Sequence, residues 1–166
     1  MEKKFKTRYS PFLLWVLGFL LLSACDSARV YEDYSDLGDA YWHLDSLQRF
    51  TFQVEDTSRS YNLFATFRNG SSYPYYNLYF QYSLKDSSDR ILAEELKETL
   101  FFDAKSGAPL GSGLGDLFDH QVLLLEGYRF SSSGAHTLTL QQSMRMDTLP
   151  FLLSVGSRLE YANQEK

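Results

Sequence analysis

The stretch Gln48-Arg-Phe50-Thr-Phe52-Gln-Val54 alternates strictly between polar and apolar side chains. A period of two places every second residue on the same face of a β-strand, so the apolar members of this stretch would be buried together. The same pattern recurs further along the chain. Its inward members are Leu63, Ala65 and Phe67; Leu78, Phe80, Tyr82 and Leu84; Val122 and Leu124; Tyr128 and Phe130; His136, Leu138 and Leu140; and Leu153, Val155 and Leu159.

Residues 90–100 leave two interpretations open. Leu92, Leu96 and Leu100 fit a period of two, but they also fit an i, i+4 helical stripe. Glu94, Glu95 and Lys97 favour helix by intrinsic propensity. We interpret the chain as strand from about Glu98 and leave 90–97 undecided. With turns between the segments, about seven or eight strands predict an all-β fold, an antiparallel sandwich of jelly-roll or immunoglobulin-like type.

Composition agrees with a β domain and excludes several functions. Among 166 residues there are 12 Tyr and 13 Phe, residue types that favour pleated sheets. One Cys and three His exclude a disulfide framework and argue against a structural metal site. The net charge of −5 argues against nucleic acid as a partner, because that partner requires a basic face.

The N-terminus has the features of a signal peptide. Basic residues at positions 3, 4, 6 and 8 precede an uncharged apolar run from Phe12 to Leu22. As a helix, the segment from Phe12 to Ala24 would be about 20 Å long. That is too short for a hydrocarbon core of about 30 Å. We therefore predict a lipoprotein signal peptide over residues 1–24.

The run ends in Leu22-Ser23-Ala24-Cys25, which resembles the bacterial lipobox. In a lipobox, cleavage follows the small residue, here Ala24, and the cysteine thiol becomes a thioether to diacylglycerol. Cys25 is the only cysteine of the chain. Two or more acyl chains anchor a protein stably, whereas one does so only marginally. We predict cleavage after Ala24, lipidation of Cys25 and attachment to a membrane through the lipid.

The mature chain is strongly acidic. Removing four basic and one acidic residue from the totals of 16 and 21 leaves 12 basic and 20 acidic residues, a net charge of −8. Anionic lipid headgroups would repel such a surface. Residues 25–40, five of them Asp or Glu, are interpreted as the lipidated cysteine and an acidic tether with a reach of about 50 Å. A single sandwich domain is expected over residues 41–166.

No constellation of reactive residues stands out. Glycines at 107, 111, 113 and 115 could bring backbone N–H groups to a phosphate, but Asp116 stands where a P-loop needs Lys and Ser or Thr. A tight loop is the simpler interpretation. No Gly-x-Ser-x-Gly elbow is present. We expect no enzyme activity, no cofactor, no metal and no small-molecule substrate.

Tyrosines are concentrated between residues 61 and 82. Tyrosine is enriched at interfaces because it combines a large area with a polar tip. Tyr73, Tyr75 and Tyr76 are therefore candidate contacts for a protein partner or a glycan, with a β core as the alternative.

Three segments, together with the lipobox, are distinctive in their order. They are Tyr61–Leu78, Gly111–Asp116 and Gln142–Glu160. With Val30-Tyr31 and Trp42 before them, the chain resembles the gliding-motility lipoprotein GldH family of Bacteroidota. The resemblance implies a cell-envelope lipoprotein required for gliding and linked to other gliding and type IX secretion proteins. It favours the outer membrane, with the inner membrane as the alternative. It supplies no catalytic residue.

Two functional hypotheses remain open. In the first, the domain is a non-enzymatic interaction component that binds or stabilises other envelope proteins. In the second, it is a glycan-binding sandwich, as many jelly rolls are, and the tyrosine-rich stretch is the basis for that alternative.

Overall fold

The computed structural model describes residues 28–162, and every regular element in that part of the chain is a β-strand. This confirms the all-β, sandwich-like fold. The strands are β1 Arg29–Asp36, β2 Tyr41–His43, β3 Gln48–Val54, β4 Tyr61–Gly70, β5 Asn77–Asp86, β6 Ile91–Leu100, β7 Ser112–Leu114, β8 Leu117–Tyr128, β9 Gly134–Gln142, β10 Thr148–Pro150 and β11 Leu152–Tyr161.

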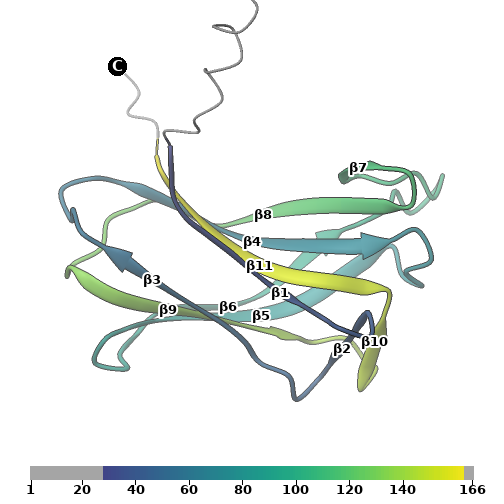
Figure 1. Cartoon of the computed structure of the whole chain (residues 1–166), viewed down its shortest axis with the longest axis horizontal. Helices are drawn as coiled ribbons and strands as arrows, with labels where there is room; N and C mark the ends of the chain where they lie inside the picture. Colours follow the sequence, from purple (N-terminus) through teal and green to yellow (C-terminus); the bar gives the residue numbers. More distant parts are fainter. Residues whose placement is uncertain (1–27, 163–166) are drawn as a thin grey trace, which may run out of the picture.

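The strands form three antiparallel sheets (Figure 1). Sheet A has the order β1-β11-β4-β8-β7, and sheet C has the order β3-β9-β5-β6. The two sheets face each other, with β1 and β11 nearest to β3. A ribbon of β2 and β10 lies at one end of the sandwich. Figure 1 shows sheet A above and sheet C below, so the outer face of sheet A points upward in that view.

The core lies between the inner faces of the two sheets, and β4 and β5 supply its centre. Phe67 of β4 is 2% exposed and lies 4.8 Å, between ring centroids, from Phe80 of β5. It also contacts the rings of Trp42 and Phe101 at 6.2 and 6.1 Å. Offset and edge-to-face aromatic pairs at these separations stabilise a core beyond the area they bury. The alternating residues predicted for β3, β4, β5 and β9 are all buried, as expected.

The β2–β10 ribbon closes one end of this core. Trp42 and Leu149 are directly paired across the ribbon, and both are fully buried. The indole Nε1 of Trp42 donates to the carbonyl of Ser46 at 2.8 Å, so its polar atom is satisfied inside the core.

The ambiguous segment is a strand throughout, because β6 begins at Ile91. Leu96 and Leu100 lie on its outer face and are 60% and 45% exposed. The opposite face, which points toward the core side, carries Glu95 and Lys97, which form an ion pair at 3.5 Å. An inward-pointing charge on an edge strand prevents another chain from extending the sheet. The i, i+4 spacing of the leucines therefore does not indicate a helix, because the same residues lie on the outer face of an edge strand.

The interpretation of residues 25–40 as a lipidated cysteine and a tether is wrong over residues 29–36, which form strand β1 along β11. Tyr31 packs its ring 5.6 Å from that of Phe52, which fixes the strand to the core. Acidic side chains of this segment, such as Glu32, point outward and find partners there. Strand β1 is thus part of the domain, which was expected only from residue 41.

The pairing of β4 with each of its neighbours, β11 and β8, contains a shift of register. We expected Leu153 to face the core, but Leu152 is fully buried instead, because the pairing of β11 with β4 shifts between Leu152 and Ser154. A bulge interrupts β8 at Glu126-Gly127, where β8 shifts register against β4.

Replacing Phe67 by alanine should lower the free energy of unfolding by about 3–5 kcal/mol, because the cavity would lie where both sheets and the end ribbon meet. Urea denaturation of the mature chain, followed through the fluorescence of buried Trp42, measures this loss. Leu114→Ala is the matched control: Leu114 is 93% exposed, and its change should stay within about 0.5 kcal/mol. Equal effects of the two substitutions would contradict this assignment of the core.

Candidate functional site

The predicted lipidation site lies outside the described residues. Neither Cys25 nor Ala24 can be placed, so lipidation and cleavage remain predictions. The described domain does constrain them, however, because β1 begins at Arg29. Only a few residues separate Cys25 from a strand that is paired into sheet A.

The three candidate tyrosines do not form one surface. Tyr73 is 5% exposed and donates its hydroxyl to the carbonyl of Asn77 at 2.9 Å, so it belongs to the core. Burial raises the pKa of its hydroxyl. Tyr75 is half-buried and donates to the sulfur of Met146. Tyr76 is 49% exposed. Of the three, Tyr76 is the one that presents a large area to a partner.

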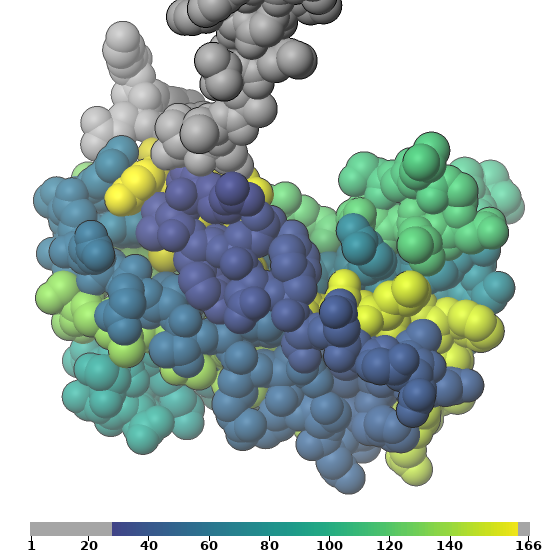
Figure 2. Space-filling model, in the orientation of Figure 1, coloured from purple at the N-terminus to yellow at the C-terminus, as the bar shows by residue number. Residues whose placement is uncertain are grey.

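The structure instead shows a groove on the outer face of sheet A. Figure 2 shows the surface hollowed between the purple atoms of β1 and the green atoms around β7. The cavity has a volume of about 200 Å³. Most of its lining residues are of polar type, and they come from β1, β4, β7, β8 and β11: Tyr34, Thr66, Phe67, Arg68, Ser112, Asp119, His120, Gln121 and Ser154.

Arg68 and Asp119 form the charged part of this groove. They are directly paired across β4 and β8, and Arg68 binds both carboxylate oxygens, with Nε–Oδ1 at 2.7 Å and Nη2–Oδ2 at 3.0 Å. The hydrogen bonds that Arg68 donates to Asp119, followed by the charge of that carboxylate, raise the pKa of Arg68. Both side chains remain about half exposed, so the pair contributes little to stability. Its bidentate geometry nevertheless holds both groups in fixed positions at the groove.

Thr66 supplies a hydroxyl without a partner. Its residue is 8% exposed, and Oγ1 has no hydrogen-bond partner among the described residues. Gly156 of β11 is paired with Thr66, and a Cβ on that glycine would meet Oγ1 and would lie 2.6 Å from Cδ1 of Tyr34. The glycine therefore lets the Tyr34 ring approach the sheet beside the hydroxyl. A buried hydroxyl left unpaired costs free energy that a bound polar group would recover.

His120 borders the groove from the core side. It is 8% exposed, and its Nε2 lies 2.9 Å from Oδ1 of Asn69, so the amide oxygen accepts and the neutral ring carries its proton on Nε2. Its ring stacks 4.2 Å from that of Phe101. Burial lowers the pKa of His120 to about 4, against the opposing charge of Asp119. His120 is therefore neutral at physiological pH.

The glycine-rich stretch forms the wall of the groove beside β7, not a phosphate cradle. Gly115 has φ of +68° at the first position of the two-residue loop between β7 and β8, where a type II′ hairpin requires glycine. A Cβ on Gly113 would collide with the carbonyl of Leu117, so β7 packs directly on β8. The interpretation as a tight loop is thus correct.

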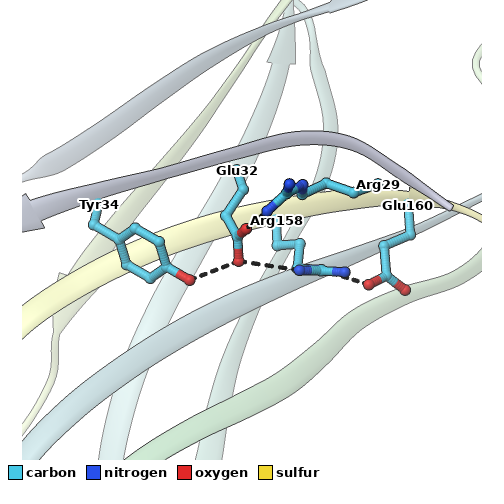
Figure 3. Close-up of polar contacts among 5 residues, drawn as sticks. All are labelled: Arg29, Glu32, Tyr34, Arg158 and Glu160. Atoms are coloured by element: carbon cyan, nitrogen blue, oxygen red, sulfur yellow. Dashed lines mark hydrogen bonds and ion pairs between the residues drawn. The ribbon is translucent and has the colours of Figure 1, made fainter. Parts of the chain in front are cut away.

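A polar network attaches β1 to β11 (Figure 3). Glu32 accepts from Tyr34 at 2.6 Å, from Arg29 at 2.7 Å and from Arg158 at 3.2 Å, and Arg158 also binds Glu160. Burial alone would raise the pKa of Glu32, but these hydrogen bonds and the charge of Arg158 outweigh it and hold the value at about 2. Glu32 and Arg158 are only 17% and 16% exposed, so this pair is less screened than a surface pair.

Residues 28–162 offer neither a metal site nor a membrane-spanning helix. No group of three or more His, Cys, Asp or Glu residues in that range could hold a metal ion. His43, His120 and His136 lie in three different sheets. The same range contains no helix that is long and apolar enough to cross a bilayer.

Sequence reasoning missed the groove residues for a physical reason. Thr66, Arg68, Asp119 and Gln121 occupy the outward positions of β4 and β8, where polar residues are the norm for a solvated face. Arg68 is also two residues from the end of β4 at Gly70, where a polar residue next to Asn and Gly resembles an ordinary turn. The remaining signal was Gly156, a glycine inside a strand, which indicates a close approach by another group.

A family model and two similar proteins point to the same family. The family model described as GldH lipoprotein matches residues 29–159. The chain is 29% identical over 162 residues to the gliding motility lipoprotein GldH homolog of Christiangramia forsetii, covering 93% of this chain and 97% of that protein. It is 28% identical over 152 residues to the gliding motility lipoprotein GldH of Flavobacterium johnsoniae, covering 87% and 92%.

Solved structures resemble the domain only weakly. The VP2 subviral particle protein of infectious bursal disease virus matches with a TM-score of 0.37 and 10% identity, covering 82% of this chain and 31% of that chain. A likeness at this level has no bearing on function.

Acidification should destabilise the fold through His120. Because the pKa falls from 6.5 in the unfolded chain to about 4 in the fold, the unfolded state binds the proton first. The contribution is intact above pH 6.5 and is lost as the pH falls toward 4. Between pH 7 and 4.5 the loss should be roughly 2–3 kcal/mol.

Urea denaturation at both pH values measures this loss. In His120→Gln the amide can still donate to Asn69 but does not titrate, so the loss over this pH range should shrink. An unchanged pH dependence in the variant would contradict the role of His120.

Proposed function

This chain belongs to the GldH lipoprotein family, and on that basis we propose that it is a non-enzymatic, lipid-anchored assembly component of the gliding machinery. Family membership supports a membrane-anchored lipoprotein of the cell envelope with a role in gliding motility. The proposal adds that the domain acts by holding other envelope proteins, including type IX secretion proteins. The outer membrane is the proposed location.

The observation that carries the proposal is the way the first strand is attached. β1 follows the predicted lipid at Cys25 almost at once and is paired with β11 from Arg29 to Asp36. Hydrogen bonds of an antiparallel pair lie across the strands, so tension along β1 would load all of them together. The Glu32–Arg158 network adds side-chain bonds to the same pair. Such an attachment suits a domain that transmits force to a membrane anchor.

Replacing Cys25 by alanine should release the protein from the membrane fraction and abolish surface spreading, because two or more acyl chains supply the anchoring free energy. Cell fractionation, incorporation of labelled palmitate and colony spreading measure the three effects in cells that carry the variant in place of the native gene. Ser27→Ala is the control and should preserve all three. Normal spreading of a soluble Cys25→Ala protein would refute the anchoring part of the proposal.

Glycan binding is a second candidate function, and the groove of sheet A is the observation that favours it. The Tyr34 ring, the fixed Arg68–Asp119 pair and the unpaired Thr66 hydroxyl are groups that recognise sugar hydroxyls and apolar sugar faces. The tyrosine-rich stretch supports it less, since Tyr73 is in the core.

If the groove binds a glycan, Thr66→Val should weaken that binding roughly tenfold, because one buried hydrogen bond to the ligand is lost. A glycan array followed by calorimetry on the mature chain measures the affinity. Tyr76→Ala, on a different part of the surface, is the matched control. Absence of sugar binding, or loss with Tyr76→Ala alone, would exclude the groove as a glycan site.

A further inference from the structure

Three leucines are exposed around the β7–β8 hairpin. Leu114, next to its tip, is 93% exposed, the highest value among the exposed large apolar residues of the described chain. Leu117, its partner across the hairpin, is 42% exposed, and Leu110, two residues before β7, is 54% exposed. Single exposed leucines are common on protein surfaces, but a cluster at a protruding tip marks a contact with an apolar partner.

The hairpin holds these leucines outward rigidly. β7 pairs with β8 from Ser112 to Leu114, and Gly113 packs so closely against the Leu117 carbonyl that a side chain would not fit between the strands. The loop is also attached to the β4–β5 connection, because the N–H of Ser71 donates to the carbonyl of Asp116 at 2.8 Å. Leu114 therefore remains presented to its surroundings instead of folding back onto the sheet.

The hairpin and the start of the domain lie on the same side of the molecule. In Figure 1 the first residues of β1 and the β7 hairpin both rise above the outer face of sheet A, at opposite ends of it. Three peptide links join Cys25 to Ala28, and whatever their conformation they span no more than about 11 Å. A lipid on Cys25 would therefore hold this side of the domain close to the bilayer.

We propose that the leucines of the β7–β8 hairpin insert into the surface of the same bilayer that holds the acyl anchor. The inference rests on the proposed function, since it takes the lipid at Cys25 as the first point of attachment. The hairpin is then a second point, which fixes the orientation of sheet A toward the membrane. The groove opens onto the space between these two points.

Charge specifies the kind of bilayer. The mature chain carries a net charge of −8, and Asp116 and Asp119 lie near the hairpin tip. The Asp119 carboxylate is paired with Arg68, and that of Asp116 lies 3.4 Å from the hydroxyl of Ser71. An anionic surface would repel this region. The occupant is therefore a membrane rich in zwitterionic lipids such as phosphatidylethanolamine.

The test uses the full acylated protein reconstituted into vesicles of phosphatidylethanolamine and phosphatidylcholine. Because Cys25 is the only native cysteine and would be acylated, Leu114→Cys introduces a single reactive thiol for a fluorescent label. Ser87→Cys, in the loop after β5 on the sheet C side, is the matched control with the same label. A quencher carried on the lipid acyl chains then reports contact with the bilayer.

The label at position 114 should be quenched several-fold more strongly than the label at position 87, and its emission should shift to shorter wavelength. Leu110→Ser in the Leu114→Cys background should reduce both effects. Equal quenching at the two positions in protein that sediments with the vesicles would overturn the hairpin contact alone. Protein that does not sediment with the vesicles would overturn the anchor first, and the hairpin inference with it.

Discussion

Phe67 occupies the position where the parts of this domain meet. Its ring contacts Phe80 from the facing sheet, Trp42 from the end ribbon and Phe101 from the connection that leaves β6. Each of these contacts buries aromatic area that the isolated sheets would leave in water. The sandwich is therefore held by its inner faces, and its outer faces are free to carry polar groups that bind or position other molecules.

On the outer face of sheet A, the polar groups are arranged around Gly156. Gly156 has no side chain, so Tyr34 of β1 can lie against the sheet, and the Thr66 hydroxyl is left beside it without a partner. The same strand pair carries the Glu32–Arg158 network. Attachment of the first strand and formation of the groove are thus consequences of one pairing, that of β1 with β11. The edge strand β6, in contrast, carries charges directed inward, which disfavour pairing with another chain.

These features make the two sides of the domain different. The start of β1, the groove and the β7–β8 hairpin lie on the outer side of sheet A, whereas sheet C covers the opposite side. A protein that is anchored at one end and works among other envelope proteins benefits from a fixed orientation. An acyl chain alone permits rotation about its attachment, whereas a second contact does not.

The sequence alone determined the β class, the buried faces of β3, β4, β5 and β9, and the family, because period-two burial and ordered segments are local properties of the chain. It did not determine that the acidic residues 29–36 form a strand, since Tyr31 and Glu32 obtain their partners from Phe52 and Arg158, far along the chain. The groove was equally hidden, because Thr66, Asp119 and Ser154 look like ordinary outward residues until three strands bring them together. Tertiary structure also decided that Tyr73 is core and Tyr76 is surface, because burial depends on what packs above a residue and not on its type.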